Sequence, residues 1–203
     1  MPRAAAAEDA DAPDPTALRP RATWLPDSYA QALGHWRGPA DINAWIGERF
    51  AYDRPRALQL SESQRAQGGR IRIHEPAAFF AQPLGVCVDL ARFAVETLRS
   101  VAPETRPAYL MIEFDPALVA GHTLRRHWLA QYQADGGHCF FADSRRPGHV
   151  AGPHADVQGF IDDYAAYRQR RIVGHRTLAS YERETRVPAS RTSRSDAARA
   201  DGR

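Results

Sequence analysis

The stretch LGVCVDLARF, residues 84–93, places Cys87 where a glycine-containing loop leads into a helix. From Val86 onward, apolar residues recur at helical spacing, at Leu90, Ala94, Leu98 and Val101. This spacing predicts a helix over about residues 86–100 that is buried along one side. Cys87 stands at the start of the helix and outside its apolar stripe.

A thiol at a helix start lies near unpaired backbone N–H groups and the positive end of the helix dipole. Both stabilise a thiolate, so we expect the pKa of Cys87 to fall below the free-cysteine value of about 8.5. The thiolate is the form that attacks a carbonyl carbon. The alternative is that Cys87 is a small buried hydrophobe, as most free cysteines are.

A second stretch, HWLAQYQADGGHCFFAD (residues 127–143), supplies the groups that a cysteine nucleophile needs. Two strand-like runs flank the turn-forming residues 134–137, which predicts a hairpin with His127 opening one strand and Asp143 closing the other. An imidazole can serve as the base for a thiol, and a carboxylate can orient the imidazole. An odd number of loop residues would place His127 and Asp143 on one sheet face, and an even number would place them on opposite faces.

The remaining elements complete an α+β fold. Helices are predicted over residues 39–51 and within HEPAAFFAQP (74–83), and a central strand over 108–114. Residues 53–73 are polar and irregular and are expected to form surface loops. A closing amphipathic helix, capped by Asp156, is outlined by Val157, Phe160, Ile161, Tyr164 and Arg168.

Composition sets the domain limits and excludes some classes of protein. Residues 1–21 and 182–203 lack a hydrophobic period and are expected to be disordered, which leaves one domain over 22–181. No apolar run approaches the roughly 20 residues of a membrane span, and the chain start lacks the apolar region of a secretory signal. We therefore expect a cytoplasmic protein with no membrane partner, its two cysteines free.

The net charge is +3, and every basic side chain is arginine, with no lysine. The arginines are dispersed and form no nucleic-acid-binding module, so no nucleic-acid partner is expected. Without lysine, the chain cannot serve as its own acceptor in glutamine–lysine crosslinking.

The segments GVCVDLA (85–91) and HWLAQYQADGGHCFFAD resemble the core of the transglutaminase-like superfamily, which includes transglutaminases, peptide N-glycanases and bacterial transglutaminase-like cysteine proteases. The shared pattern is a cysteine that starts a helix after a glycine-containing loop, a histidine that starts a strand, and an aspartate that ends the next strand. The resemblance covers about residues 40–170. It implies a papain/transglutaminase-like core, with the cysteine-bearing helix packed on an antiparallel sheet.

By this resemblance Cys87 is the nucleophile, His127 the general base and acid, and Asp143 the residue that orients the histidine. The implied activity is that of a cysteine-dependent amide hydrolase or acyltransferase, acting through a thioester on a peptide or protein amide and needing no cofactor. Cys87 lacks the aromatic residue that often follows the cysteine of crosslinking enzymes, and the chain lacks their extra domains. Hydrolysis or deamidation is therefore expected over crosslinking.

Four further residues are candidates for roles at the site. Gln82, five residues before the cysteine, is a candidate oxyanion donor beside the Cys87 N–H, or else an exposed glutamine at a helix end. Arg126, Arg145 and Arg146 flank the proposed triad and are candidates for a substrate rim, or else ordinary solvated arginines.

Two other functions stay open. A catalytically inactive module with the same fold could use its arginines to bind an acidic peptide or a carboxylate. A zinc site could draw on the zinc-binding residue types gathered in one region: His122, His127, His138, Cys139, His149 and His154. Their spacing fits no closed zinc motif, and adjacent residues of a strand point to opposite faces, so no metal is expected.

Overall fold

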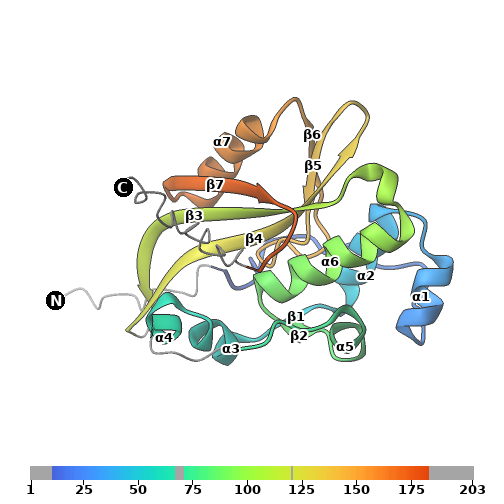
Figure 1. The fold of residues 1–203 in the computed structure, drawn as a ribbon, viewed down its shortest axis with the longest axis horizontal. Helices are drawn as coiled ribbons and strands as arrows, with labels where there is room; N and C mark the ends of the chain where they lie inside the picture. The colour runs from blue at the N-terminus through green and yellow to red at the C-terminus, as the bar shows by residue number, and fades with distance from the viewer. Residues whose placement is uncertain (1–10, 67–70, 120, 183–203) are drawn as a thin grey trace, which may run out of the picture.

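The structure is a computed structural model that describes residues 11–66, 71–119 and 121–182. Its centre is a five-stranded antiparallel sheet with strand order β6-β5-β4-β3-β7. The strands are β3 (Ala108–Val119), β4 (His122–Ala134), β5 (Gly137–Phe141), β6 (Ala151–His154) and β7 (Ile172–Leu178). Helices cover both faces of this sheet (Figure 1), which confirms the α+β class.

One face of the sheet carries α6 (Cys87–Val101), the predicted cysteine-bearing helix. Its stripe of Leu90, Ala94 and Leu98 is fully buried against Trp128 and Ala130 of β4. The same core includes side chains from three more helices, α1 (Tyr29–His35), α2 (Pro39–Arg49) and α5 (Pro76–Ala81). The predicted helices at 39–51, within 74–83 and at 86–100 are thereby confirmed.

The opposite face carries α7 (Val157–Arg168). The Asp156 carboxylate accepts a hydrogen bond of 2.8 Å from the Gly159 N–H, which is the predicted N-cap. Phe160 and Tyr164 pack in a second buried cluster with strand residues such as Leu129. The sheet is therefore enclosed between two helical layers.

Several elements differ from the sequence-based expectations. Part of the region 53–73 is helical, as α3 (Arg54–Gln59) and α4 (Glu62–Ala66), because the Asp53 side chain caps α3 through the Arg56 N–H. Residues 67–70 of that region lie outside the described residues. A short parallel pair, β1 (Ala51–Tyr52) with β2 (Leu84–Gly85), was not expected. Neither was β7, an edge strand beside β3 whose polar, partly exposed side chains hide its pattern.

Residues 11–21, part of the segment expected to be disordered, lie against the domain. Asp11 is buried, and the Asp14 N–H donates a hydrogen bond of 2.8 Å to the Arg145 carbonyl. The contacts are mainly polar, which explains why no hydrophobic period marks this segment. Residues 1–10 and 183–203, the rest of the two segments expected to be disordered, lie outside the described residues.

Within the described ranges, no helix is both long and apolar enough to cross a membrane.

Candidate active site

The first turn of α6 fixes the position of Cys87. Asp89, two residues further on, is fully buried, and its Oδ2 accepts the Val86 N–H at 3.1 Å. The Arg56 guanidinium donates two hydrogen bonds of 2.7 Å to the Asp89 carboxylate. An N–H at the helix start and a buried ion pair thus hold the turn that carries the sulfur.

Close packing around Gly85 favours glycine in this turn. A Cβ at this position would lie 3.0 Å from Asp89 Cβ and 3.0 Å from Phe79 Cε2. A larger residue would therefore require Asp89 or Phe79 to shift by a few tenths of an ångström. The preference for glycine at this position therefore comes from the nearby side chains and not from an unusual backbone conformation.

His127 and Asp143 form a buried hydrogen-bonded pair. The distance from His127 Nε2 to Asp143 Oδ1 is 3.1 Å, and both side chains are almost fully excluded from solvent. His127 lies in the middle of β4, opposite Ile112 of β3, and does not open the strand as expected, because β4 already begins at His122. The structure therefore brings together the predicted base and its orienting carboxylate.

The hairpin register alone does not explain this pair. The turn has two residues, Asp135 and Gly136, with φ angles of 52° and 76°, and Ala130 pairs with Phe141. Two residues further along each strand, this register would place Asp143 opposite Trp128, on the sheet face away from His127.

Ala142 changes the direction of the chain at this point. The strand β5 ends at Phe141, and Ala142 adopts a φ of 59°, in the left-handed region. The regular alternation of side chains stops there, and Asp143 turns to the face of His127. The loop has an even number of residues, which by itself would direct His127 and Asp143 to opposite faces. The positive φ of Ala142 brings the two side chains back into contact.

Asp143 is held by donors on every side. Tyr164 donates its hydroxyl to Oδ2 at 3.1 Å, the Arg146 Nε approaches Oδ2 at 3.3 Å, and the Arg145 N–H donates to Oδ1 at 2.9 Å. Burial alone would raise the pKa of Asp143, but His127 and nearby cations lower it below its usual value. The carboxylate therefore stays ionised and fixed in orientation.

The Cys87 sulfur lies beside the His127 ring. The Cys87 Sγ, a ring nitrogen of His127 and a carboxylate oxygen of Asp11 all lie within 4.8 Å of one another. All three residues are buried. Both cysteines of the chain are free thiols. The nucleophile, base and carboxylate expected from sequence are thus neighbours in space.

The protonation of the pair differs from the expectation. Burial raises the pKa of Cys87 above its usual value, outweighing the His127 ring and the Trp128 N–H, which lower it. The expected lowering by the helix start is therefore wrong for this structure. Burial also acts to lower the pKa of His127, but Tyr164, Asp11 and Asp143 raise it well above its usual value.

The other candidate residues divide into two groups. Arg145 and Arg146 both contact the Asp143 carboxylate and help to hold it in place. Arg126 is exposed and pairs with Glu113 at 3.2 Å. Gln82 is exposed at the C-terminal end of α5, and its role as an oxyanion donor stays a prediction.

Sequence reasoning missed the roles of Asp11, Tyr164 and Arg168. The last two are four residues apart on α7, and both contact the site. A charged residue in the apolar stripe of a helix was the available signal, because arginine is rarely buried without a partner. Asp11 carried no such signal, since it belongs to a polar segment.

Asp11, Cys87 and His127 are also the one group of three or more metal-ligating side chains in the described parts of the chain. The donor types suit zinc. However, Arg168 Nη2 lies 2.8 Å from Asp11 Oδ1, so this carboxylate is already paired with a guanidinium cation. Two positive charges on one oxygen disfavour a metal ion there.

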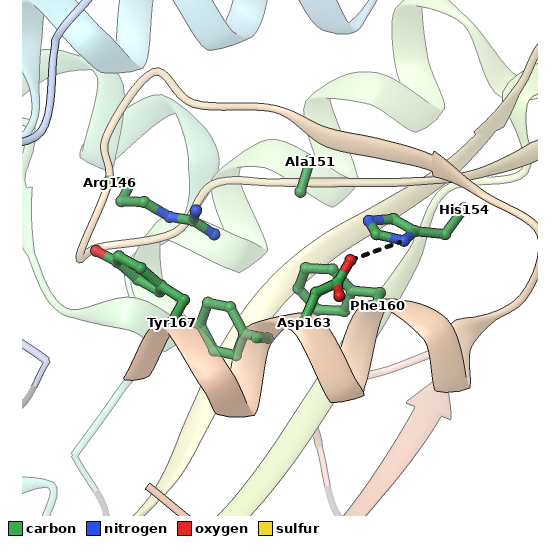
Figure 2. Close-up of a pocket in the computed structure, with 7 residues that line it drawn as sticks. Arg146, Ala151, His154, Phe160, Asp163 and Tyr167 are labelled. Atoms are coloured by element: carbon green, nitrogen blue, oxygen red, sulfur yellow. Dashed lines mark ion pairs between the residues drawn. The ribbon is translucent and has the colours of Figure 1, made fainter. Parts of the chain in front are cut away.

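A small pocket of about 170 Å³ lies between the β5–β6 region and α7 (Figure 2). Its walls are Arg146, Ala151, His154, Phe160, Asp163, Tyr164 and Tyr167. Arg146 and Tyr164 also contact Asp143, so the pocket borders the Asp143 end of the His127–Asp143 pair. His154 and Asp163 form an ion pair of 3.8 Å at its other end.

No protein-family model matches this sequence, and a search of curated proteins finds no match. The chemistry of the site is therefore the basis of the functional proposal.

Proposed function

We propose that this protein is a transglutaminase-like cysteine hydrolase or acyltransferase that acts on a peptide or protein amide through a thioester on Cys87. The observation that carries the proposal is the buried His127–Asp143 pair, 3.1 Å apart, with its imidazole beside the sulfur of Cys87 at a helix start. A helix that bears a cysteine and packs on an antiparallel sheet supports the papain/transglutaminase-like core. A free thiol suits the reducing cytoplasm, and that location stays a prediction.

In the proposed reaction the neutral imidazole of His127, which forms as the pH rises through the raised pKa of this residue, accepts the Cys87 proton, and the thiolate attacks the amide carbonyl carbon. The oxyanion is held by the Cys87 N–H and a second donor, for which Gln82 is the candidate. The His127 imidazolium protonates the leaving amine, the C–N bond breaks and a thioester remains. Water, deprotonated by His127, then attacks the thioester and releases a carboxylic acid and the thiol. Asp143 keeps the imidazole oriented throughout.

The burial of the ion pair favours catalysis over a purely binding module. Taking an imidazolium and a carboxylate out of water costs several kcal/mol per ion, and apolar residues fill such space equally well. Asp143 is nevertheless supplied with a tyrosine hydroxyl, a backbone N–H and an arginine. Three donors to one carboxylate beside a thiol fit an aspartate that must stay charged during a reaction.

Acylation with p-nitrophenyl acetate tests the proposal. The thiolate attacks the ester carbonyl, p-nitrophenolate leaves, and an acetyl group on Cys87 is detected by intact-mass and peptide mass spectrometry. The test uses wild-type protein and Asp11→Ala, because Asp11 lies within 4.8 Å of the sulfur. We expect acetylation of Cys87 that is lost in Cys87→Ala and His127→Ala and kept in Cys139→Ala. Acetylation that is independent of His127, or absent from Cys87 in both proteins, would contradict the proposal.

A further inference from the structure

The Asp11 carboxylate lies inside the site, against the catalytic base. Its Oδ1 accepts a hydrogen bond of 2.8 Å from Arg168 Nη2 and lies 3.2 Å from His127 Nδ1. A carboxylate oxygen of Asp11 is also within 4.8 Å of the Cys87 sulfur. A guanidinium and an imidazole thus converge on one carboxylate beside the nucleophile.

Arg168 is built into an environment that requires an anion. Its side chain is only 2% exposed, its Nη1 donates to the Tyr164 hydroxyl at 2.9 Å, and its guanidinium lies 4.8 Å from the centre of the Phe114 ring. A buried cation among aromatic rings is costly unless a negative charge compensates it. The planar guanidinium is also the group best suited to a carboxylate.

The segment that delivers Asp11 is held by polar contacts along its length. The Ser144 hydroxyl donates to the Asp11 carbonyl at 2.9 Å, and Arg145 donates to the Ala12 carbonyl at 2.8 Å. Further along, Tyr167 donates to Asp14 at 3.1 Å. Few apolar side chains of the segment are buried, and Leu18 is 92% exposed. Little apolar area therefore opposes departure of this segment, and the main cost is the separation of Asp11 from Arg168, which an incoming carboxylate would offset.

We propose that Arg168 and His127 form a carboxylate-binding subsite beside the Cys87 sulfur, that Asp11 fills it from within the chain, and that the substrate places an acidic side chain or terminal carboxylate there. The part that names the substrate class rests on the proposed function. The binding subsite itself does not, because a carboxylate binds there whether or not turnover follows.

The first test measures alkylation of Cys87 by iodoacetamide in the full chain, with Cys139 as an internal reference. Removing Asp11 takes away a carboxylate within 4.8 Å of the sulfur, and with it a negative charge that raises the pKa of Cys87. We expect Asp11→Ala to speed alkylation of Cys87 at least severalfold, because loss of the neighbouring negative charge enlarges the thiolate population. Asp115→Ala, which removes an exposed acid paired with Arg171, is the matched control and should change nothing. Equal rates in wild type and Asp11→Ala would overturn the proposal.

The second test adds sodium acetate or neutral acetamide to Asp11→Ala, with ionic strength held constant by sodium chloride. Acetate should refill the subsite and slow alkylation of Cys87 severalfold, whereas acetamide should not. Wild-type protein should respond to neither. Equal protection by both compounds, or by neither, would overturn the proposal.

The double variant Asp11→Ala/Arg168→Gln assigns the effect to the guanidinium. We expect it to lose the protection by acetate, and undiminished protection would overturn the role of Arg168. If this variant does not fold, as judged by circular dichroism, the contrast between acetate and acetamide in Asp11→Ala still decides the question.

The two proposals can fail separately. Protection by acetate without acylation of Cys87 by p-nitrophenyl acetate would support the subsite and contradict the enzymatic proposal. Acylation of Cys87 without protection by acetate would support the enzymatic proposal and contradict the subsite.

Discussion

His127 Nε2 lies 3.1 Å from Asp143 Oδ1, although the hairpin that joins these residues has a register that directs their side chains to opposite faces. The contact exists because Ala142, with a φ of 59°, ends the regular strand one residue before the aspartate. A pair that depends on an unusual backbone conformation and is buried in the domain is a costly arrangement to maintain.

Asp143→Asn should slow the chemistry at Cys87 with the site otherwise intact. The amide keeps the size of the carboxylate but lacks the charge that stabilises the His127 imidazolium. The rate of Cys87 acetylation by p-nitrophenyl acetate should fall about 100-fold, the scale of general acid–base assistance. Asp115→Asn, which changes an exposed acid paired with Arg171, should react like wild type. An unchanged rate in a folded Asp143→Asn protein would remove Asp143 from the mechanism.

Stability should fall as the pH rises from 6.5 to 8 because of His127. Its pKa in the folded protein is raised well above the usual value, chiefly because Tyr164, Asp11 and Asp143 outweigh the opposing effect of burial. The folded state therefore holds a proton that the unfolded state releases above about pH 6.5. The stabilisation is fully present below that pH and is lost as the pH approaches the folded pKa, by at most about 1.4 kcal/mol per pH unit.

The measurement is urea unfolding at several pH values for wild type and His127→Gln. The variant should show the flatter dependence. Burial and Arg146 lower the pKa of His149, which acts in the opposite direction but is common to both proteins. A variant that loses stability with pH as steeply as wild type would contradict the raised pKa of His127.

Asp89→Asn should destabilise the start of α6. The substitution removes the charge that binds Arg56 through two hydrogen bonds of 2.7 Å, and it leaves a largely buried guanidinium without its anion. Breaking a buried pair in this way costs about 3 kcal/mol or more, measured as the free energy of unfolding in urea. Asp115→Asn, which breaks an exposed pair with Arg171, should cost less than about 1 kcal/mol. Similar losses in the two variants would mean that the Asp89 pair has no special role.

Gly85→Ala should lower stability although the change is one methyl group. The new Cβ would lie 3.0 Å from carbon atoms of Asp89 and Phe79, both of which are fully buried. Such overpacking costs about 1–3 kcal/mol. The control is Gly34→Ala in α1, where a Cβ meets no atom within 4 Å. That change should instead stabilise the protein by up to about 1 kcal/mol, because glycine is a poor helix former. A neutral Gly85→Ala would show that β2 can move away from α6.

The sequence by itself determined the elements whose residues repeat with a regular period. The helix that starts at Cys87, the strands that carry His127 and precede Asp143, and the helix capped by Asp156 all follow from local hydrophobic spacing and turn chemistry. The α+β class and the choice of triad candidates rest on these elements alone.

Only the tertiary structure decided how these residues meet. The side of the sheet to which Asp143 points depends on one backbone angle at Ala142, which alanine does not signal. The raised pKa of Cys87 depends on burial by the whole domain and on the charge of Asp11, a residue distant in sequence. Asp11 and Arg168 lie 157 positions apart and meet through hydrogen bonds, which leave no hydrophobic period in the sequence. Local patterns record what a segment buries, whereas polar contacts between distant segments depend on where the completed fold places them.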